Sequence, residues 1–132
     1  MSQKLDTIAI VEDEDFYYWK MLLFLSELNI PIERYISRKG ALRFAESTKQ
    51  TKNKVFWIID GNFPKFDNEW IETMWPSLIR NMEDYEISYA GMVWFTSDLR
   101  IFVWIDVLVF KKLYFTESMW NIVELILKAH KS

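Results

Sequence analysis

The sequence predicts a doubly wound α/β fold, in which helices cover both faces of a parallel sheet. Two observations carry this prediction: short apolar runs recur along the chain, and stripes with helical spacing separate them. The runs are residues 8–11, the weaker 32–36, 55–59, 92–95 and 107–110. A strand that is buried on both faces is a nearly unbroken apolar run. Because such strands alternate here with helices, we expect right-handed crossovers and a parallel sheet.

Four apolar stripes at 3.6-residue spacing predict the helices. The first covers residues 18–28, and the second follows Ser37, a residue type that caps helix N-termini. The third covers residues 71–82 and contains Pro76, which should kink this helix or restart it. The last covers residues 119–127.

Composition favours one soluble domain over residues 1–132. The chain is 51% apolar, which is ample for a core and too hydrophobic for disorder. A net charge of −3 with interspersed signs argues against a nucleic-acid partner, because phosphate backbones need a basic face. The longest near-apolar run, residues 101–110, is too short to span a bilayer, and the N-terminus has no secretory signal. We therefore expect a cytoplasmic protein with no membrane partner.

The chain has no cysteine and one histidine, His130, which we expect in a solvated tail. Thiolate and multi-histidine metal sites are therefore excluded. The seven tryptophans exceed what one sheet and its helices can bury, so an exposed aromatic patch is expected.

Polar residues follow four of the predicted strands at the point where each strand ends. They are Glu12 and Asp13, Asp60, Thr96 and Ser97, and Lys111 and Lys112. Taken singly, Asp60 or Thr96 would be a helix cap, and the acidic residues a solvated first turn. The carboxyl ends of parallel strands, however, meet at one edge, where open α/β sheets bind ligands. We therefore expect these side chains to lie together.

These residue types suit phosphoryl transfer assisted by a metal ion. Neighbouring carboxylates repel unless a cation or a proton joins them, and oxygen ligands suit Mg²⁺. A carboxylate beside Mg²⁺ can attack phosphorus and form an aspartyl phosphate. A lysine ammonium and a threonine hydroxyl can each bind an oxygen of the transferred group.

Four segments resemble the strand-end motifs of response regulator receiver domains of two-component signalling. They are IAIVEDED, IIDGNFPKFDN, WFTSD and VFKKLY, which occur in the family's order and are spread over nearly the whole chain. The most specific is the D-x-x-F-P pattern from Asp60 to Pro64, which is similar to the family's D-x-x-M-P. The resemblance implies a single receiver-like domain, flavodoxin-like, with a five-stranded sheet in the order 2-1-3-4-5.

The resemblance also implies a role for each residue at this edge. The ligands of Mg²⁺ would be Glu12, Asp13, Asp60 and the backbone carbonyl of Asn62. Asp60 would be the phosphoacceptor, and Asp13 the more direct metal ligand of the acidic pair. Thr96 would be the switch hydroxyl. Lys112 would contact the phosphoryl group, with Lys111 as the alternative in the other register.

By this resemblance the chain is a stand-alone response regulator receiver. It would accept a phosphoryl group on Asp60 from a histidine kinase or a phosphotransfer protein, and signal through a downstream protein target. At most, Mg²⁺-dependent autophosphorylation and autodephosphorylation are expected of it as an enzyme. The alternative is a degenerate receiver, a phosphorylation-independent interaction module. A flavin-binding protein of this fold is more distant, because acidic residues after the first strand would repel a flavin phosphate.

Three departures from the family pattern lie in the second half of the chain. No proline follows either lysine, and Val109, or Leu108 in the other register, occupies the place of an aromatic residue. The interval between Thr96 and Lys112 leaves room for only a short or degenerate fourth helix. These departures favour the degenerate alternative, whereas the acidic pair and Thr96 favour the phosphoacceptor.

The same interval predicts a protein interface. Residues 101–105 are all apolar, so some must face outward whether the segment is helical or extended. Exposed apolar surface usually marks a partner site, and we expect a homodimer through Phe102, Trp104 and the last helix. The alternative is that a long third helical segment, displaced by Pro76, covers this surface.

Overall fold

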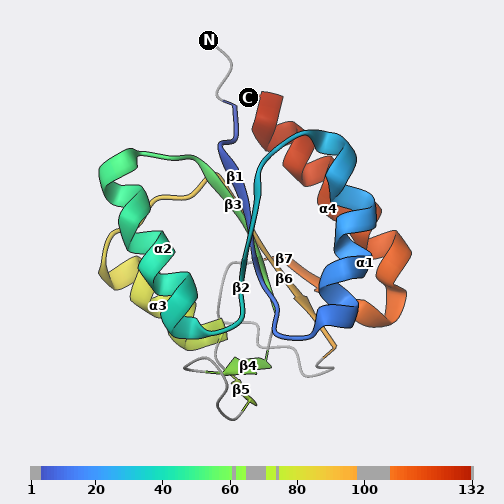
Figure 1. Ribbon diagram of the computed structural model, residues 1–132, viewed down its shortest axis with the longest axis horizontal. Helices are drawn as coiled ribbons and strands as arrows, with labels where there is room; N and C mark the ends of the chain where they lie inside the picture. The colour runs from blue at the N-terminus through green and yellow to red at the C-terminus, as the bar shows by residue number, and fades with distance from the viewer. Residues whose placement is uncertain (1–3, 61, 65–70, 74, 98–107, 132) are drawn as a thin grey trace.

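The computed structural model describes residues 4–60, 62–64, 71–73, 75–97 and 108–131. Its centre is a five-stranded parallel sheet in the order β2-β1-β3-β6-β7 (Figure 1). The strands are β1 (Thr7–Val11), β2 (Ile32–Tyr35), β3 (Val55–Ile59), β6 (Gly91–Thr96) and β7 (Leu108–Lys111). Counted along the chain, these strands have the order 2-1-3-4-5, so the predicted doubly wound sheet is confirmed.

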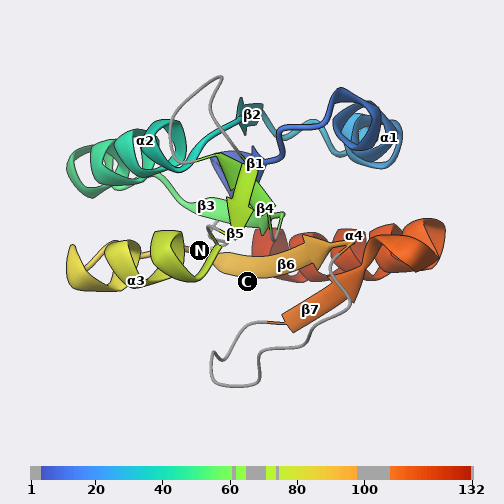
Figure 2. The same ribbon diagram turned by 90° about the horizontal axis from the view of Figure 1, so that it is seen from below.

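Helices cover both faces of the sheet, as predicted (Figures 1 and 2). On one face lie α1 (Asp15–Leu25) and α4 (Phe115–Lys131), and on the other lie α2 (Arg38–Thr51) and α3 (Trp75–Asp84). The short 3-10 helices η1 (Ser26–Leu28) and η2 (Lys112–Tyr114) follow α1 and β7. Among the described residues, no helix is long and apolar enough to cross a membrane.

Alternate residues of the central strands contribute to two separate cores. In β1, Ile8 and Ile10 pack on the side of α1 and α4, whereas Ala9 and Val11 pack on the side of α2 and α3. Every residue of β1 and β3 is buried. The continuous apolar runs of β1 and β3 therefore correctly indicated strands that are covered on both faces. The edge strands β2 and β7, in contrast, are only partly buried.

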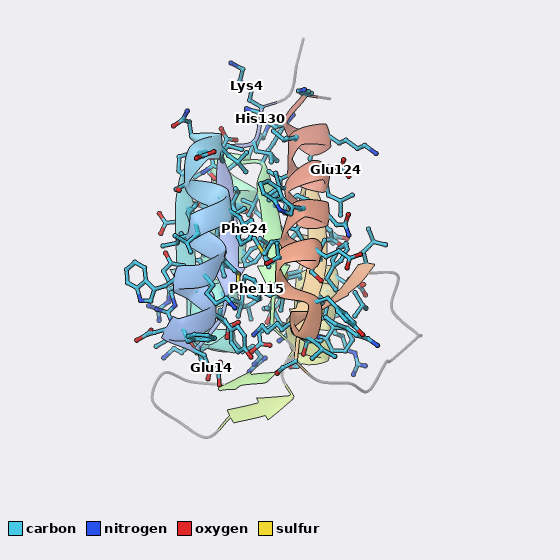
Figure 3. The ribbon with its side chains drawn as sticks, turned by 90° about the vertical axis from the view of Figure 1, so that its right-hand side faces the viewer. Lys4, Glu14, Phe24, Phe115, Glu124 and His130 are labelled. Atoms are coloured by element: carbon cyan, nitrogen blue, oxygen red, sulfur yellow. The ribbon has the colours of Figure 1, made fainter. Side chains whose placement is uncertain are left out.

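The helix α1 also exposes an apolar stripe to solvent. Phe16, Trp19 and Leu23, which we call the α1 stripe, are 66%, 62% and 78% exposed. On the neighbouring helix α4, Trp120 is exposed as well, and its ring meets that of Phe24 edge-on at 5.3 Å. Figure 3 shows Phe24 between the two helices. The expected exposed aromatic patch is therefore present on this face.

The structure corrects the predicted helix over residues 71–82. Its first three residues form strand β5 (Ile71–Thr73), which pairs antiparallel with β4 (Asn62–Pro64) in a second, small sheet. The helix α3 begins only at Trp75, so Pro76 lies in its first turn. A proline is tolerated there because the first N–H groups of a helix have no partner within it. Pro76 therefore lies at the start of the helix, which agrees with the predicted restart and not with a kink.

The ends of the five predicted strands differ from the prediction by at most one residue, whereas α1 begins at Asp15 and α4 extends from Phe115 to Lys131, beyond the stripes that predicted them. The cap of α2 is as predicted, because Ser37 Oγ accepts a hydrogen bond from Gly40 N–H at 3.2 Å. The strand β2 ends at Tyr35, and β7 begins at Leu108. The predicted short fourth helix, with Phe102 and Trp104, falls within residues 98–107, outside the described residues.

His130 does not lie in a solvated tail, contrary to the expectation from its place in the sequence. The ring is half-buried, and its Nδ1 accepts a hydrogen bond from Leu5 N–H at 3.0 Å. Figure 3 shows His130 at the same end of the molecule as Lys4. The last turn of α4 therefore satisfies a backbone donor of the buried residue that leads into β1.

We expect His130→Ala to lower the free energy of unfolding by about 1 kcal/mol, because Leu5 N–H loses its acceptor. Urea denaturation followed by circular dichroism measures this loss. Lys128→Ala changes an exposed residue of the same helix and is the control, with an expected change near zero. Equal losses in the two variants would contradict a stabilising role for the hydrogen bond.

Candidate functional site

The predicted site residues lie at the carboxyl edge of the sheet. Glu12 and Asp13 follow β1, and Asp60 follows β3. Thr96 ends β6, and Lys112 follows β7. The β4–β5 hairpin lies at this same end of the molecule (Figure 1). Parallel strands end at one edge, so residues from distant parts of the chain meet here.

Backbone hydrogen bonds extend the sheet by one residue into the site. Glu12 N–H donates to Tyr35 O at 3.0 Å, and Asp60 N–H donates to Val11 O at 2.9 Å. The strands β1 and β3 are neighbours in register, with Val11 opposite Ile59. Glu12 and Asp60 therefore lie side by side on backbone that the sheet holds in place.

Glu12, Asp13 and Asp60 form what we call the carboxylate cluster. One carboxylate oxygen of each lies within 4.8 Å of those of the other two. Glu12 and Asp60 are buried, whereas Asp13 is partly exposed. Glu12 Oε2 also accepts a hydrogen bond from Glu14 N–H at 3.2 Å, which orients this carboxylate. The cluster therefore combines two buried carboxylates with one that contacts solvent.

Lys112 places its ammonium group within this cluster. Its Nζ forms ion pairs with Glu12 Oε1 and with Asp60 Oδ1, the latter at 3.2 Å. The side chain of Lys112 is only 1% exposed, and its Nζ lies 4.0 Å from the centre of the Tyr17 ring. A buried ammonium is stable only beside negative charge, and here two carboxylates supply it.

The other predicted residues lie at the same edge but make different contacts. Lys111 ends β7 and accepts a hydrogen bond from Ser118 on its carbonyl, at 2.9 Å. It forms no ion pair with any residue that the structure describes. Thr96 is buried and pairs with Lys111 across the sheet. Asn62 begins β4, where it pairs with Thr73. The geometry therefore separates the two lysines, because only Lys112 contacts the carboxylates.

Burial and neighbouring charges raise the pKa values in the cluster. Burial raises the pKa of Glu12 to about 8, and the charge of Asp60 adds to this, while Lys112 opposes it. Burial likewise raises the pKa of Asp13. Burial alone would lower the pKa of Lys112, but the charges of Asp60 and Glu12 outweigh it and raise this pKa. All three groups therefore hold protons more tightly than they would in water.

The carboxylate cluster is a candidate site for a divalent cation. When all three carboxyl groups are ionised, they and the Lys112 ammonium leave a surplus of two negative charges (3 − 1 = 2), which a divalent cation would balance. The donor atoms of the cluster are all oxygens, and the chain has no cysteine. This donor set suits Mg²⁺ and not Zn²⁺. The residues present therefore fit Mg²⁺, which the carboxylate cluster and the Asn62 carbonyl would hold.

Two residues of the site were missed by the sequence reasoning. Tyr17 covers the Lys112 ammonium, and Arg34 Nε donates a hydrogen bond to Glu12 O at 3.0 Å. Neither belongs to a motif: Tyr17 is one of several aromatic residues on α1, and Arg34 is an ordinary polar residue of a short strand. Arg34 could have been found only from the pairing of β2 with β1, which places it opposite Ile10 and close to the end of β1.

Comparisons with known proteins agree with this architecture. No family model matches the chain, and no curated protein matches its sequence. A solved signal receiver domain of an HD domain-containing protein from Pseudomonas fluorescens Pf-5 is 14% identical, with a TM-score of 0.68, over 96% of this chain and 98% of that one. The structure of FixJ-N is 19% identical, with a TM-score of 0.67, over 98% of this chain and 95% of that one.

A third solved structure shows a protein of this fold in an activated conformation. The BeF3-activated conformation of SdrG from Pseudomonas melonis Fr1 is 18% identical, with a TM-score of 0.62, over 95% of this chain and 98% of that one. At these identities the likeness concerns the fold. The chain therefore has the fold of response regulator receiver domains over nearly its whole length.

Proposed function

We propose that this protein is a response regulator receiver that accepts a phosphoryl group on Asp60 from a histidine kinase or a phosphotransfer protein. The observation that carries the proposal is the position of the Lys112 ammonium between Glu12 and Asp60, with Asp13 beside them. A nucleophile, a cation and the ligands for a divalent metal ion thus meet at the edge where open α/β sheets bind ligands. The receiver fold supports the same function.

In the proposed reaction a carboxylate oxygen of Asp60 attacks the phosphorus of the donor. The bond from phosphorus to the leaving atom of the donor breaks, the leaving atom keeps the electron pair, and an aspartyl phosphate forms. Later attack by water on phosphorus releases inorganic phosphate and restores the carboxylate. Both steps distribute negative charge over the phosphoryl oxygens, so positive groups held nearby accelerate them.

The residues around Asp60 have complementary roles in this proposal. Lys112 Nζ, 3.2 Å from Asp60 Oδ1, is close enough to bind an oxygen of a phosphoryl group on that carboxylate. Thr96, at the end of the neighbouring strand, would donate a hydrogen bond from its hydroxyl to a second phosphoryl oxygen. Mg²⁺, held by the carboxylate cluster and the Asn62 carbonyl, would neutralise charge on the phosphoryl oxygens. The ring of Tyr17 shields the Lys112 ammonium from water.

Such a receiver acts through proteins that bind its surface. The α1 stripe begins at Phe16, in the first turn of the helix that follows the acidic pair, so its first residue is near the site end of α1. Large exposed apolar side chains of this kind mark protein contacts, which supports a kinase or phosphotransfer protein and a downstream target as partners. The homodimer through Phe102, Trp104 and α4 stays a prediction, which the exposed Trp120 of α4 supports. We place this activity in the cytoplasm, without nucleic acid or membrane as a partner.

The experiment that tests the proposal is phosphorylation by a small phosphodonor. Wild-type protein incubated with Mg²⁺ and acetyl phosphate should gain the mass of one phosphoryl group, in a form that is stable to acid and labile to base. Asp60→Asn should abolish this gain, because an amide oxygen is a far weaker nucleophile than a carboxylate. Omission of Mg²⁺ should suppress it in the wild type. Asp84→Asn, which changes an exposed carboxylate at the end of α3, is the control and should be phosphorylated normally.

A phosphoryl group that persists in Asp60→Asn would refute the assignment of this residue. A folded wild type that gains no mass with any small phosphodonor, and whose spectra do not respond to BeF3, would favour the degenerate interaction module. That second function is supported by the α1 stripe and by Val109 in place of the family's aromatic residue.

A further inference from the structure

Arg34 connects the edge strand β2 to the acidic pair at the end of β1. Its Nε donates to the backbone carbonyl of Glu12 at 3.0 Å, and its Nη1 forms an ion pair with Asp15 at 2.8 Å. The centre of its guanidinium lies 4.5 Å from the centre of the Tyr18 ring. The side chain is 20% exposed, so this arginine packs along the protein and does not extend into solvent.

These contacts hold the peptide that joins the two acidic residues. The N–H of Glu12 is bonded to Tyr35 O, and its carbonyl is bonded to Arg34, so β2 holds Glu12 on both sides. The peptide group is planar, and the orientation of the Glu12 carbonyl therefore sets the orientation of the Asp13 N–H. It follows that Arg34 influences the directions in which both acidic side chains leave the backbone.

The guanidinium is itself held in one orientation. A planar guanidinium has several donors, so it can contact Glu12 O and Asp15 at the same time while its face lies on the Tyr18 ring. A lysine has one ammonium group and could satisfy only part of this arrangement.

We propose that Arg34 is a positioning residue for Mg²⁺ binding: by fixing the Glu12–Asp13 peptide from β2, it holds both carboxylates in the geometry that binds the ion. The inference rests on the proposed function, since it takes Mg²⁺ as the ligand of the carboxylate cluster. Residues that orient metal ligands commonly change metal affinity by about 10-fold or more when they are replaced.

A purely structural role for Arg34 makes a different prediction. The ion pair with Asp15 contributes little, because that carboxylate is 77% exposed. If Arg34 only stabilised the fold, its replacement would lower the melting temperature equally with and without Mg²⁺. A positioning role instead reduces the increase in melting temperature that Mg²⁺ produces.

The test is calorimetric titration with Mg²⁺ alone, together with thermal melts with and without Mg²⁺ and with no phosphodonor. Arg34→Met, which keeps the length of the stem and loses the donors and the charge, should weaken Mg²⁺ binding by about 10-fold. Arg34→Lys keeps the charge and should also bind more weakly than the wild type. The control is Arg43→Met, which removes an arginine at an exposed position of α2. It should bind Mg²⁺ within about twofold of the wild type.

The possible outcomes separate a failure of this inference from a failure of the proposed function. A wild type that shows no response to Mg²⁺ would refute the metal site and this inference with it. A wild type that binds Mg²⁺, together with Arg34 variants that bind equally well, would refute the inference alone. If Arg34→Met does not fold, Arg34→Lys decides by the same criterion.

Discussion

Lys112→Met is expected to lower the free energy of unfolding by about 3 to 5 kcal/mol at about pH 8 without divalent cations. The substitution leaves Glu12 and Asp60 buried without the ammonium that now contacts both. Mg²⁺ should recover part of the loss, because it brings positive charge to the same carboxylates. The loss should also shrink at about pH 5, where the carboxyl groups can take up protons instead.

Urea denaturation of the wild type and the variant, with and without Mg²⁺, measures this effect. Lys111→Met is the matched control, since it removes the adjacent lysine, which forms no ion pair within the described part of the chain. Its expected loss is about 0.5 kcal/mol or less. Equal losses in the two variants would show that the cluster does not depend on Lys112, and a larger loss in Lys111→Met would favour the other register.

Without metal, the protein should lose stability on the order of 3 kcal/mol between about pH 5 and pH 8, and Glu12→Gln should remove most of this loss. The pKa of Glu12 is raised from 4.5 to about 8 by burial and by the charge of Asp60. The folded protein therefore binds this proton more tightly than the unfolded chain does. The resulting stability is complete below the unfolded pKa and is lost as the pH rises through the folded one. The raised pKa of Asp13 acts in the same direction.

The measurement is a series of urea denaturation curves across this pH range in the presence of a chelator. The quantity to compare is the difference between the wild type and Glu12→Gln, because other carboxyl groups titrate in both proteins. Glu124→Gln, at an exposed position of α4, should leave the pH dependence of the wild type unchanged. A difference that does not change with pH would contradict the strong burial of a titrating Glu12.

The carboxylate cluster could be predicted because it depends on where strands end. Asp60 directly follows an apolar run, and Glu12 follows another, so the ends of both strands are visible in the sequence. Parallel pairing of these two strands was then enough to bring the two carboxylates together. No knowledge of helix orientation was needed, and the prediction held.

The β4–β5 hairpin could not be predicted from the same kind of pattern. Residues 71–82 have apolar side chains at helical spacing, and this local signal favoured helix on both sides of Pro76. The first three of them instead pair with Asn62–Pro64, and the helix starts beside Pro76. The pairing of two short segments depends on tertiary context, which overrides local preference over so few residues.

His130 illustrates the same limit for a single side chain. Its place near the C-terminus indicated a solvated residue. Its hydrogen-bond partner is instead the backbone N–H of Leu5, at the other end of the chain. Nothing in the local sequence of either residue signals this bond, since it exists only because α4 packs beside the start of β1.

The sequence by itself determined which five segments form the strands of the main sheet, the presence of α1, α2 and α4, and the position of the carboxylates at the strand ends, because apolar periodicity is a local property. Only the tertiary structure decided that Lys112 and not Lys111 contacts the cluster, and that Arg34 holds the backbone of Glu12. Lys112 and Glu12 lie 100 residues apart in the sequence. Contacts of this kind depend on strand register and on the direction in which each side chain leaves its backbone, and these are set by packing across the whole molecule.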